Sequence, residues 1–401
     1  MLRGRITRRI IVMATLAVGL LVCCSIVSLI RTGGNTDVAK DPGPPIVRLS
    51  PGIDVGLVRS VSFSPCGRFF STVKNDGTVT VHTSSGRQLF SVKVPDATDA
   101  VLSHDGRFAL AYSRLDPTNG NLTFLDSQGR VCWQLQVAGA VWSADAYSTD
   151  RGARFVVGTG ERYIYVIDIA DKQRNFRRWR VPGAVTSVVF TAQGDHIIYA
   201  TWQDSVIGRC TLRGGNIWQQ DAESSSLHYI ERLERADRIL VRAVPNRFGT
   251  DGSYMLLDGA GERISNGELS ADENARVLAA PNGQYLCIGV DKLIRHKGKS
   301  MRERHAVLLD ASGNVLCEKG SPFFQADPIL VTTRGYVLLS NPKHEIFTMS
   351  PTGHLKSSLK LSSAISRMVA SRDGSRLLLQ CRDGSLYILS ASYNDAATAR
   401  R

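Results

Sequence analysis

A pattern of four short apolar runs, repeated from end to end, constrains the fold of this chain most strongly. In residues 98–137 the runs are separated by SHDG, a longer polar insert and DSQG, whose glycines suit turns that need positive φ. The last run, Val131 to Val137, alternates apolar and polar residues as a half-buried outer strand does. The unit therefore predicts four antiparallel strands. So small a sheet must stack on copies of itself to bury its faces.

The unit can be traced eight times along the chain. The copies begin near Val58, Thr98, Ala140, Ala184, Leu227, Ala275, Asp327 and Ala364. In seven of the eight copies the turn between the first two strands carries glycine at a similar place. A period of about 40 residues with four strands per unit is the signature of a β-propeller. We therefore predict an all-β, eight-bladed β-propeller of four-stranded blades over residues 46–393, with a seven-bladed ring as the alternative.

The eighth copy supplies only three strands before the polar tail at residues 394–401. Residues 46–53, IVRLSPGI, parallel residues 358–365, SLKLSSAI, which leave one unit and enter the next. We therefore expect the N-terminal strand to complete the last blade. Closing the ring in this way removes the open strand edges at its two ends.

The repeats resemble those of known propeller families. SFSPCGRFF (62–70), LSHDGRFAL (102–110) and VASRDGSRLLL (369–379) resemble WD40-type and TolB-like repeats. LDSQGRVCW (125–133) and TLRGGNIW (211–218) resemble the quinoprotein-type repeat, with Trp133 and Trp218 as its docking tryptophans. The resemblance implies a propeller and blade-packing roles for both tryptophans. It leaves the function open, because propellers serve as scaffolds, receptors and enzymes alike.

An apolar segment at the N-terminus predicts a membrane anchor. Ile10 to Ile30 is a run of 21 residues without a charge, long enough to cross a bilayer as a helix. Four arginines precede it: Arg3, Arg5, Arg8 and Arg9. This excess of positive charge predicts a cytoplasmic segment at 1–9, a transmembrane helix at 10–30, a linker at 31–45 and an extracytoplasmic propeller on a single-pass cell-membrane protein. A cleaved signal peptide is the alternative, although no A-x-A-like site follows the apolar run.

The sequence contains no recognisable catalytic, cofactor-binding or metal site. The cysteines after residue 46 are scattered without C-x-x-C, and the histidines form no pair at metal or catalytic spacing. Dehydrogenases that use pyrroloquinoline quinone need a calcium site, an acidic base and often adjacent cysteines. The only adjacent pair here, Cys23 and Cys24, lies in the predicted membrane helix. We therefore expect no cofactor and favour a protein-binding or scaffold module. The alternative is a quinoprotein-like dehydrogenase or other propeller enzyme whose site is assembled from distant loops.

Two basic stretches are candidates for binding, because the formal net charge of +13 favours anionic partners. KQRNFRRWR (172–180) is interpreted as a solvated outer strand of the third blade. DKLIRHKGKSMRERH (291–305) is predicted to be a loop between the second and third strands of the sixth blade. Its basic residues form the candidate binding loop: Lys292, Arg295, Lys297, Lys299, Arg302 and Arg304. We expect a protein partner on this face of the propeller. An anionic envelope polymer or lipid is the alternative, and nucleic acid is disfavoured.

Overall fold

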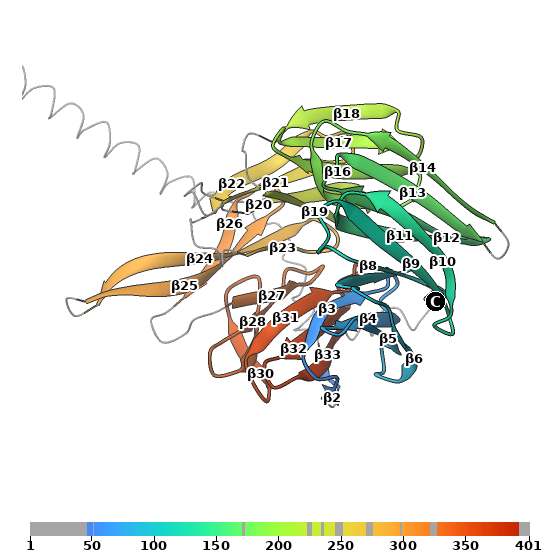
Figure 1. The fold of residues 1–401 in the computed structure, drawn as a ribbon. Coiled ribbons are helices and arrows are strands. Elements are labelled where there is room, and N and C mark those ends of the chain that lie inside the picture. Colours follow the sequence, from blue (N-terminus) through green and yellow to red (C-terminus); the bar gives the residue numbers. More distant parts are fainter. Residues whose placement is uncertain are drawn as a thin grey trace, which may run out of the picture. The chain divides into compact units, whose positions relative to one another are not determined.

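The computed structural model describes residues 46–50, 52–170, 173–222, 227–233, 236–244, 252–269, 276–296, 299–320 and 327–392. Within these residues, strands β1 to β33 form eight antiparallel sheets (Figure 1). The sheets are the blades of a β-propeller and are numbered here in chain order.

The first four blades each contain four consecutive strands. Blade 1 contains β3 (Val58–Phe63), β4 (Phe69–Lys74), β5 (Thr78–Thr83) and β6 (Gln88–Lys93). Blade 2 contains β7 (Asp99–Leu102), β8 (Phe108–Tyr112), β9 (Asn119–Asp126) and β10 (Val131–Ala138). Blade 3 contains β11 (Val141–Thr149), β12 (Gly152–Thr159), β13 (Tyr163–Ala170) and β14 (Arg174–Arg180). Blade 4 contains β15 (Ala184–Phe190), β16 (His196–Trp202), β17 (Val206–Thr211) and β18 (Asn216–Asp221).

The next three blades repeat this order, and the last one draws on both ends of the described chain. Blade 5 contains β19 (Leu227–Leu233), β20 (Arg238–Val244), β21 (Gly252–Asp258) and β22 (Arg263–Leu269). Blade 6 contains β23 (Val277–Ala279), β24 (Tyr285–His296), β25 (Lys299–Asp310) and β26 (Val315–Gly320). Blade 7 contains β27 (Asp327–Val331), β28 (Val337–Ser340), β29 (Glu345–Met349) and β30 (Leu355–Lys360). Blade 8 contains β31 (Ile365–Ala370), β32 (Arg376–Cys381), β33 (Ser385–Ser392) and β1 (Ile46–Leu49), while β2 (Ile53–Asp54) also pairs with β33.

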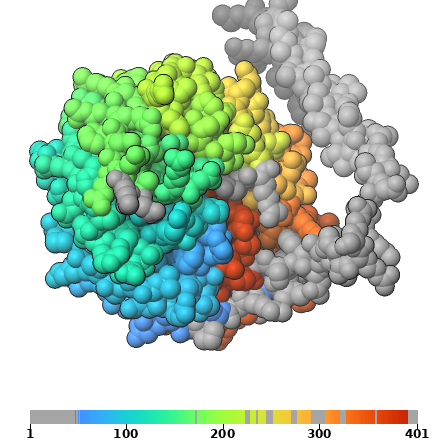
Figure 2. Space-filling model, turned by 90° about the vertical axis from the view of Figure 1, so that its right-hand side faces the viewer, coloured from blue at the N-terminus to red at the C-terminus, as the bar shows by residue number. Residues whose placement is uncertain are grey.

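The N-terminal strand closes the ring, as the sequence predicted. Strand β1 pairs antiparallel with β33, with Ile46 opposite Ser392 and Leu49 opposite Leu389. The Ser50 amide donates to the Ile388 carbonyl at 2.9 Å, and the Ser50 hydroxyl accepts from the Ile388 amide at the same distance. In the space-filling view the blue first blade lies against the red last blade (Figure 2). The edge of β33 is therefore covered.

The apolar core is divided into clusters that lie between neighbouring blades. The described residues form eight such clusters, one for each pair of adjacent blades, including the pair formed by blades 8 and 1. Between blades 2 and 3, for example, Leu110 and Phe124 pack with Phe155, and all three are fully buried. Each blade buries its two faces against its neighbours, so we expect a single unit to be unstable by itself. The eight-bladed prediction is confirmed, and the seven-bladed alternative is wrong.

The two tryptophans singled out in the sequence pack within and between blades. Trp133 stacks on Phe124 with ring centroids 5.4 Å apart. The Trp218 indole lies over Gly261 of the next blade, where a Cβ would come within 2.9 Å of the ring, and its Nε1 donates to the Gly259 carbonyl at 3.2 Å. Gly261 has a φ of 89°, so glycine serves both the turn and the close approach of the indole. Both tryptophans are structural, as predicted.

The six described cysteines are free thiols. Cys287 and Cys317 lie on β24 and β26, separated by β25. Burial raises the pKa of the Cys210 thiol to about 12. Such thiols remain protonated near neutral pH and act as small apolar core residues.

The predicted cytoplasmic segment, membrane helix and linker at residues 1–45 lie outside the described residues, and so does the tail at 394–401. The described part of the chain contains no helix that is long and apolar enough to cross a membrane.

Candidate binding site in the central cavity

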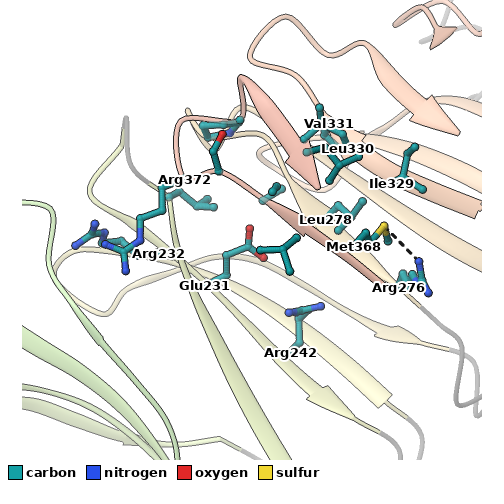
Figure 3. A pocket seen from close by; sticks show the side chains of 18 of the residues that line it. Glu231, Arg232, Arg242, Arg276, Leu278, Ile329, Leu330, Val331, Met368 and Arg372 are labelled. Carbon is teal, nitrogen blue, oxygen red and sulfur yellow. Dashed lines mark hydrogen bonds between the residues drawn. The ribbon is translucent and has the colours of Figure 1, made fainter. Parts of the chain in front are cut away.

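The first strands of most blades border a cavity at the centre of the ring. It has a volume of about 750 Å³ and is lined by residues of blades 1, 2 and 4 to 8 (Figure 3). The first strand of a blade is its innermost strand, so side chains from units far apart in sequence meet here. This volume lies within the range of about 300–1,000 Å³ that is usual for ligand sites.

Arginine dominates the polar lining of this central cavity. Its arginines are Arg114, Arg232, Arg242, Arg276, Arg367 and Arg372. Against these six, two carboxylates line the cavity, Asp99 and Glu231. A guanidinium group cannot be deprotonated in a protein, so the cavity is positively charged at every physiological pH. Apolar side chains lie between the charges, among them Leu278, Met368 and Val369.

One end of the cavity is crossed by the first turn of blade 8, residues 371–374. Arg372 in this turn forms an ion pair with Asp145 on β11 of blade 3, and the Asp145 side chain is only 7% exposed. A Cβ on Gly374 would come within 2.3 Å of Pro281 in blade 6, so the backbones approach closely there as well. Blades 3 and 6 are not neighbours of blade 8. The turn therefore reaches into the centre of the ring and ties blades from different sides together.

Arg232 lies towards the same end and is also fixed by the protein. Arg232 is the penultimate residue of β19 and is 8% exposed. Its Nη1 donates to the Phe190 carbonyl at 2.6 Å and also to the Thr191 carbonyl. Its charge is thus held against the backbone of blade 4. Arg232 and Arg372 are structural parts of this end of the cavity.

The other end of the cavity holds arginines that have no carboxylate hydrogen-bonded to them within the described residues. Arg276 and Arg367 lie at the starts of first strands, and Arg242 lies near the end of β20, so all three belong to the face that carries the connections between blades. The Arg276 Nη1 contacts the Met368 sulfur at 3.5 Å. The Arg242 Nε is buried and has no hydrogen-bond partner among the described residues. We call Arg242, Arg276 and Arg367 the arginine triad.

Two further side chains complete this end. Arg114, in the insert of blade 2, donates from Nη2 to Asp99 at 2.6 Å and to the Tyr112 hydroxyl at 3.3 Å, so its charge is compensated. Tyr229 stands opposite Arg242 in the β19–β20 ladder and is 41% exposed. Tyr229 also lies near Arg114.

Glu231 also lines the cavity and lies near Arg242 of the arginine triad. Burial raises the pKa of Glu231, and the nearby Arg242 opposes that effect. A raised pKa means that its charged form is disfavoured in the folded protein. Glu231 is therefore a weak internal counter-charge for the triad, and it competes with any external anion.

The candidate binding loop of the sequence lies elsewhere and is not a loop. Strands β24 and β25 continue to His296 and from Lys299, so Lys292, Arg295, Lys299, Arg302 and Arg304 occupy paired strands, while Lys297 lies outside the described residues. The loop prediction was wrong because a dense run of charges was read as irregular structure. Charged residues of this kind also occur in paired strands, so their density alone does not separate a loop from a hairpin.

This hairpin extends beyond its own blade. In the described residues, β23 pairs with β24 only as far as Ile288, and β26 pairs with β25 only from His305. Among the described residues, 291–296 and 299–304 pair only with each other and form a two-stranded ribbon, which we call the blade 6 ribbon. It projects away from the other strands in Figure 1.

The other basic stretch forms β14, an outer strand, as the sequence predicted. Arg177 pairs with Asp168 of the adjacent strand at 2.6 Å. Arg178 lies over the Tyr163 ring, 5.1 Å from its centroid. These arginines are engaged within blade 3, in agreement with the interpretation as an edge strand.

Sequence reasoning missed the central cavity. The first strands of most units read as apolar, whereas ERLER in blade 5 and SRMVASR in blade 8 insert charges into that run. These charges could have indicated the cavity, because charged residues are rarely buried in an inner strand unless they face a polar space.

The fold and this site together define the class of protein: an eight-bladed β-propeller with a basic central cavity. No protein-family model matches the chain, and no curated protein matches it. The fold is similar to those of solved propeller structures. The Dos1 propeller matches with a TM-score of 0.62 and 10% identity, covering 86% of this chain and 95% of its own.

Two further structures are similar to the same extent. Sqt1 from Saccharomyces cerevisiae matches with a TM-score of 0.61 and 10% identity, covering 86% of this chain and 98% of its own. BamB from Moraxella catarrhalis matches with a TM-score of 0.59 and 14% identity, covering 86% of this chain and 100% of its own. At these identities the likeness shows the propeller fold alone.

Proposed function

We propose that this chain is a membrane-anchored, extracytoplasmic β-propeller that binds a protein partner and acts as a scaffold. The blade 6 ribbon is the observation that carries the proposal. Both outer edges of a two-stranded ribbon have free backbone donors and acceptors, and an exposed ribbon is a surface to which another chain can add. Similarity to solved propeller structures supports the proposal only at the level of the fold, because propellers often serve as scaffolds. At 10–14% identity these structures do not indicate which partner this chain binds.

The arginine-rich lining of the central cavity favours binding over catalysis. Guanidinium groups hold anions by fork-shaped hydrogen bonds, but they do not exchange protons near neutral pH. No group of three or more metal-ligating side chains lies within the described residues. The guanidinium groups that line the cavity are suited to hold an anionic ligand.

The predicted orientation has a direct test. Protease added to intact cells or spheroplasts is expected to remove the propeller, because the charge distribution around residues 10–30 predicts that residues after 30 lie outside the cytoplasm. A cytoplasmic protein followed in the same samples is the control and should be spared. Protection of the propeller until the membrane is permeabilised would show that the orientation is reversed.

The role of the ribbon is tested by a fivefold charge variant in a cross-linking pull-down from native membranes. We expect replacement of Arg295, Lys297, Lys299, Arg302 and Arg304 by Ser to remove most of the captured partner. Partner capture by the parent chain should also fall with rising salt, since exposed charges are screened over about 8 Å at physiological ionic strength.

A matched variant controls for the loss of charge. It replaces five exposed arginines in turns on the opposite face of the propeller: Arg87, Arg107, Arg130, Arg151 and Arg213. This variant should capture the partner as the parent does. Equal capture by both variants would refute the ribbon as the docking surface. Capture of anionic polymer or lipid, with no protein, would replace the scaffold by the polymer-binding alternative.

A further inference from the structure

The arginine triad has the properties of an anion-binding site. Arg242, Arg276 and Arg367 come from blades 5, 6 and 8 and line one cavity. Within the described residues they have no hydrogen bond to a carboxylate, although the other cavity arginines are tied to Asp99, Asp145 or backbone carbonyls. Cationic groups that face one cavity without a carboxylate partner favour a ligand of opposite charge.

The lining between the arginines limits what kind of anion fits. Leu278, Met368 and Val369 are partly buried and border the same space. A compact inorganic anion would leave these apolar side chains without contacts. A peptide can present carboxylates to arginines on separate blades and apolar side chains to the surface between them. Its backbone can also enter from the face on which the exposed Tyr229 lies.

We propose that this end of the central cavity binds an acidic peptide segment that also carries apolar side chains. Its carboxylates pair with the arginine triad, and its apolar side chains pack on Leu278, Met368 and Val369. This peptide would belong to the protein partner and form a second contact beside the blade 6 ribbon, so the inference rests on the proposed function. The triad and the blade 6 ribbon are different elements, so each contact can be removed by itself.

Glu231 provides a test in the opposite direction. Its carboxyl group occupies the cavity beside Arg242 and competes with the carboxylates of a peptide. The variant E231Q keeps the shape of the side chain and removes that competing charge. Since burial disfavours the charged form of Glu231, the neutral amide is also tolerated by the fold.

The experiment measures fluorescence anisotropy of a labelled hexapeptide of glutamate and leucine with the purified full-length protein. Each of R242Q, R276Q and R367Q is expected to weaken binding about tenfold, the effect of losing one hydrogen bond to a charged group. E231Q should tighten it severalfold. R87Q, an exposed turn arginine outside the cavity, should bind as the parent does. Thermal melting of each variant shows whether the fold is intact.

Three outcomes overturn the proposal. The first is that the parent does not bind the glutamate peptide more tightly than a matched glutamine peptide. The second is that the triad variants bind as the parent does, or that E231Q weakens binding instead of tightening it. The third is that pyrophosphate or citrate binds with the same dependence on the triad while the peptide does not bind, which would assign the cavity to a small free anion.

Failure of this inference is distinguishable from failure of the proposed function. If the triple variant R242Q/R276Q/R367Q still captures the partner from membranes and the ribbon variant does not, the scaffold function stands and the cavity is not the peptide site. If the triple variant alone loses capture, the peptide site stands and the ribbon is not the docking surface.

Discussion

A chain that lacks residues 1–54 is expected to unfold at a much lower temperature than one that lacks residues 1–40, and to aggregate. The longer deletion removes β1 and β2, so the edge of β33 becomes free to pair with other chains. It also removes Val47 and Ile53, which pack against the apolar clusters on either side of blade 8. Both side chains are partly buried, so their loss removes apolar contacts from two inter-blade clusters.

Differential scanning calorimetry and light scattering of the two truncated proteins provide the measurement. The deletion of residues 1–40 is the matched control, because it leaves every described strand in place. Its melting should be cooperative. If both truncated proteins melt at the same temperature and remain monomeric, closure of the ring by β1 and β2 does not stabilise the propeller.

Replacing either partner of the Arg372–Asp145 pair is expected to destabilise the protein by about 3–5 kcal/mol, the usual cost of leaving one buried charge without its partner. Asp145 is 7% exposed on its side chain and also accepts a hydrogen bond from the Phe190 amide at 2.9 Å. The pair therefore joins blades 3, 4 and 8. D145A and R372A should each lower the midpoint of urea unfolding, and the double variant should lose less than the sum of the two.

The control is an exposed pair in the same turn of another blade. Arg107 and Asp105 form an ion pair in blade 2, and their side chains are 48% and 27% exposed. R107A should change the free energy of unfolding by about 1 kcal/mol or less, because exposed ion pairs contribute little. If R372A and R107A cost the same, the contact across the ring does not stabilise the fold.

The strands and the ring closure could be predicted because their signals are local. Turns such as residues 64–67 and 103–106 carry glycine with φ near 65° and 71° at Gly67 and Gly106, and a sequence shows such turns directly. The closing strand was visible for a related reason. IVRLSPGI repeats the residue types found where one unit passes into the next, so its place in the blade followed from the repeat.

The ribbon was predicted in the right place with the wrong structure. Its charges indicated exposure, which both a loop and a solvated ribbon satisfy. What separates the two is pairing between the arms, such as Lys292 opposite Glu303, and a register of this kind depends on the strands that start it at Tyr285 and Asp310. A prediction from residue types therefore identified the residues of the hairpin but not their pairing.

By itself the sequence determined the repeating strands, the number of blades and the closing strand, because period-2 patterns and turn glycines act over a few residues. The tertiary structure alone decided which charges meet. Arg372 and Asp145 are 227 positions apart, and the arginine triad comes from three different blades. Each of these arginines looks like an ordinary surface charge within its own repeat. Only closure of the ring turns the inner strands toward a common space, where the charges are compensated at one end and left for a ligand at the other.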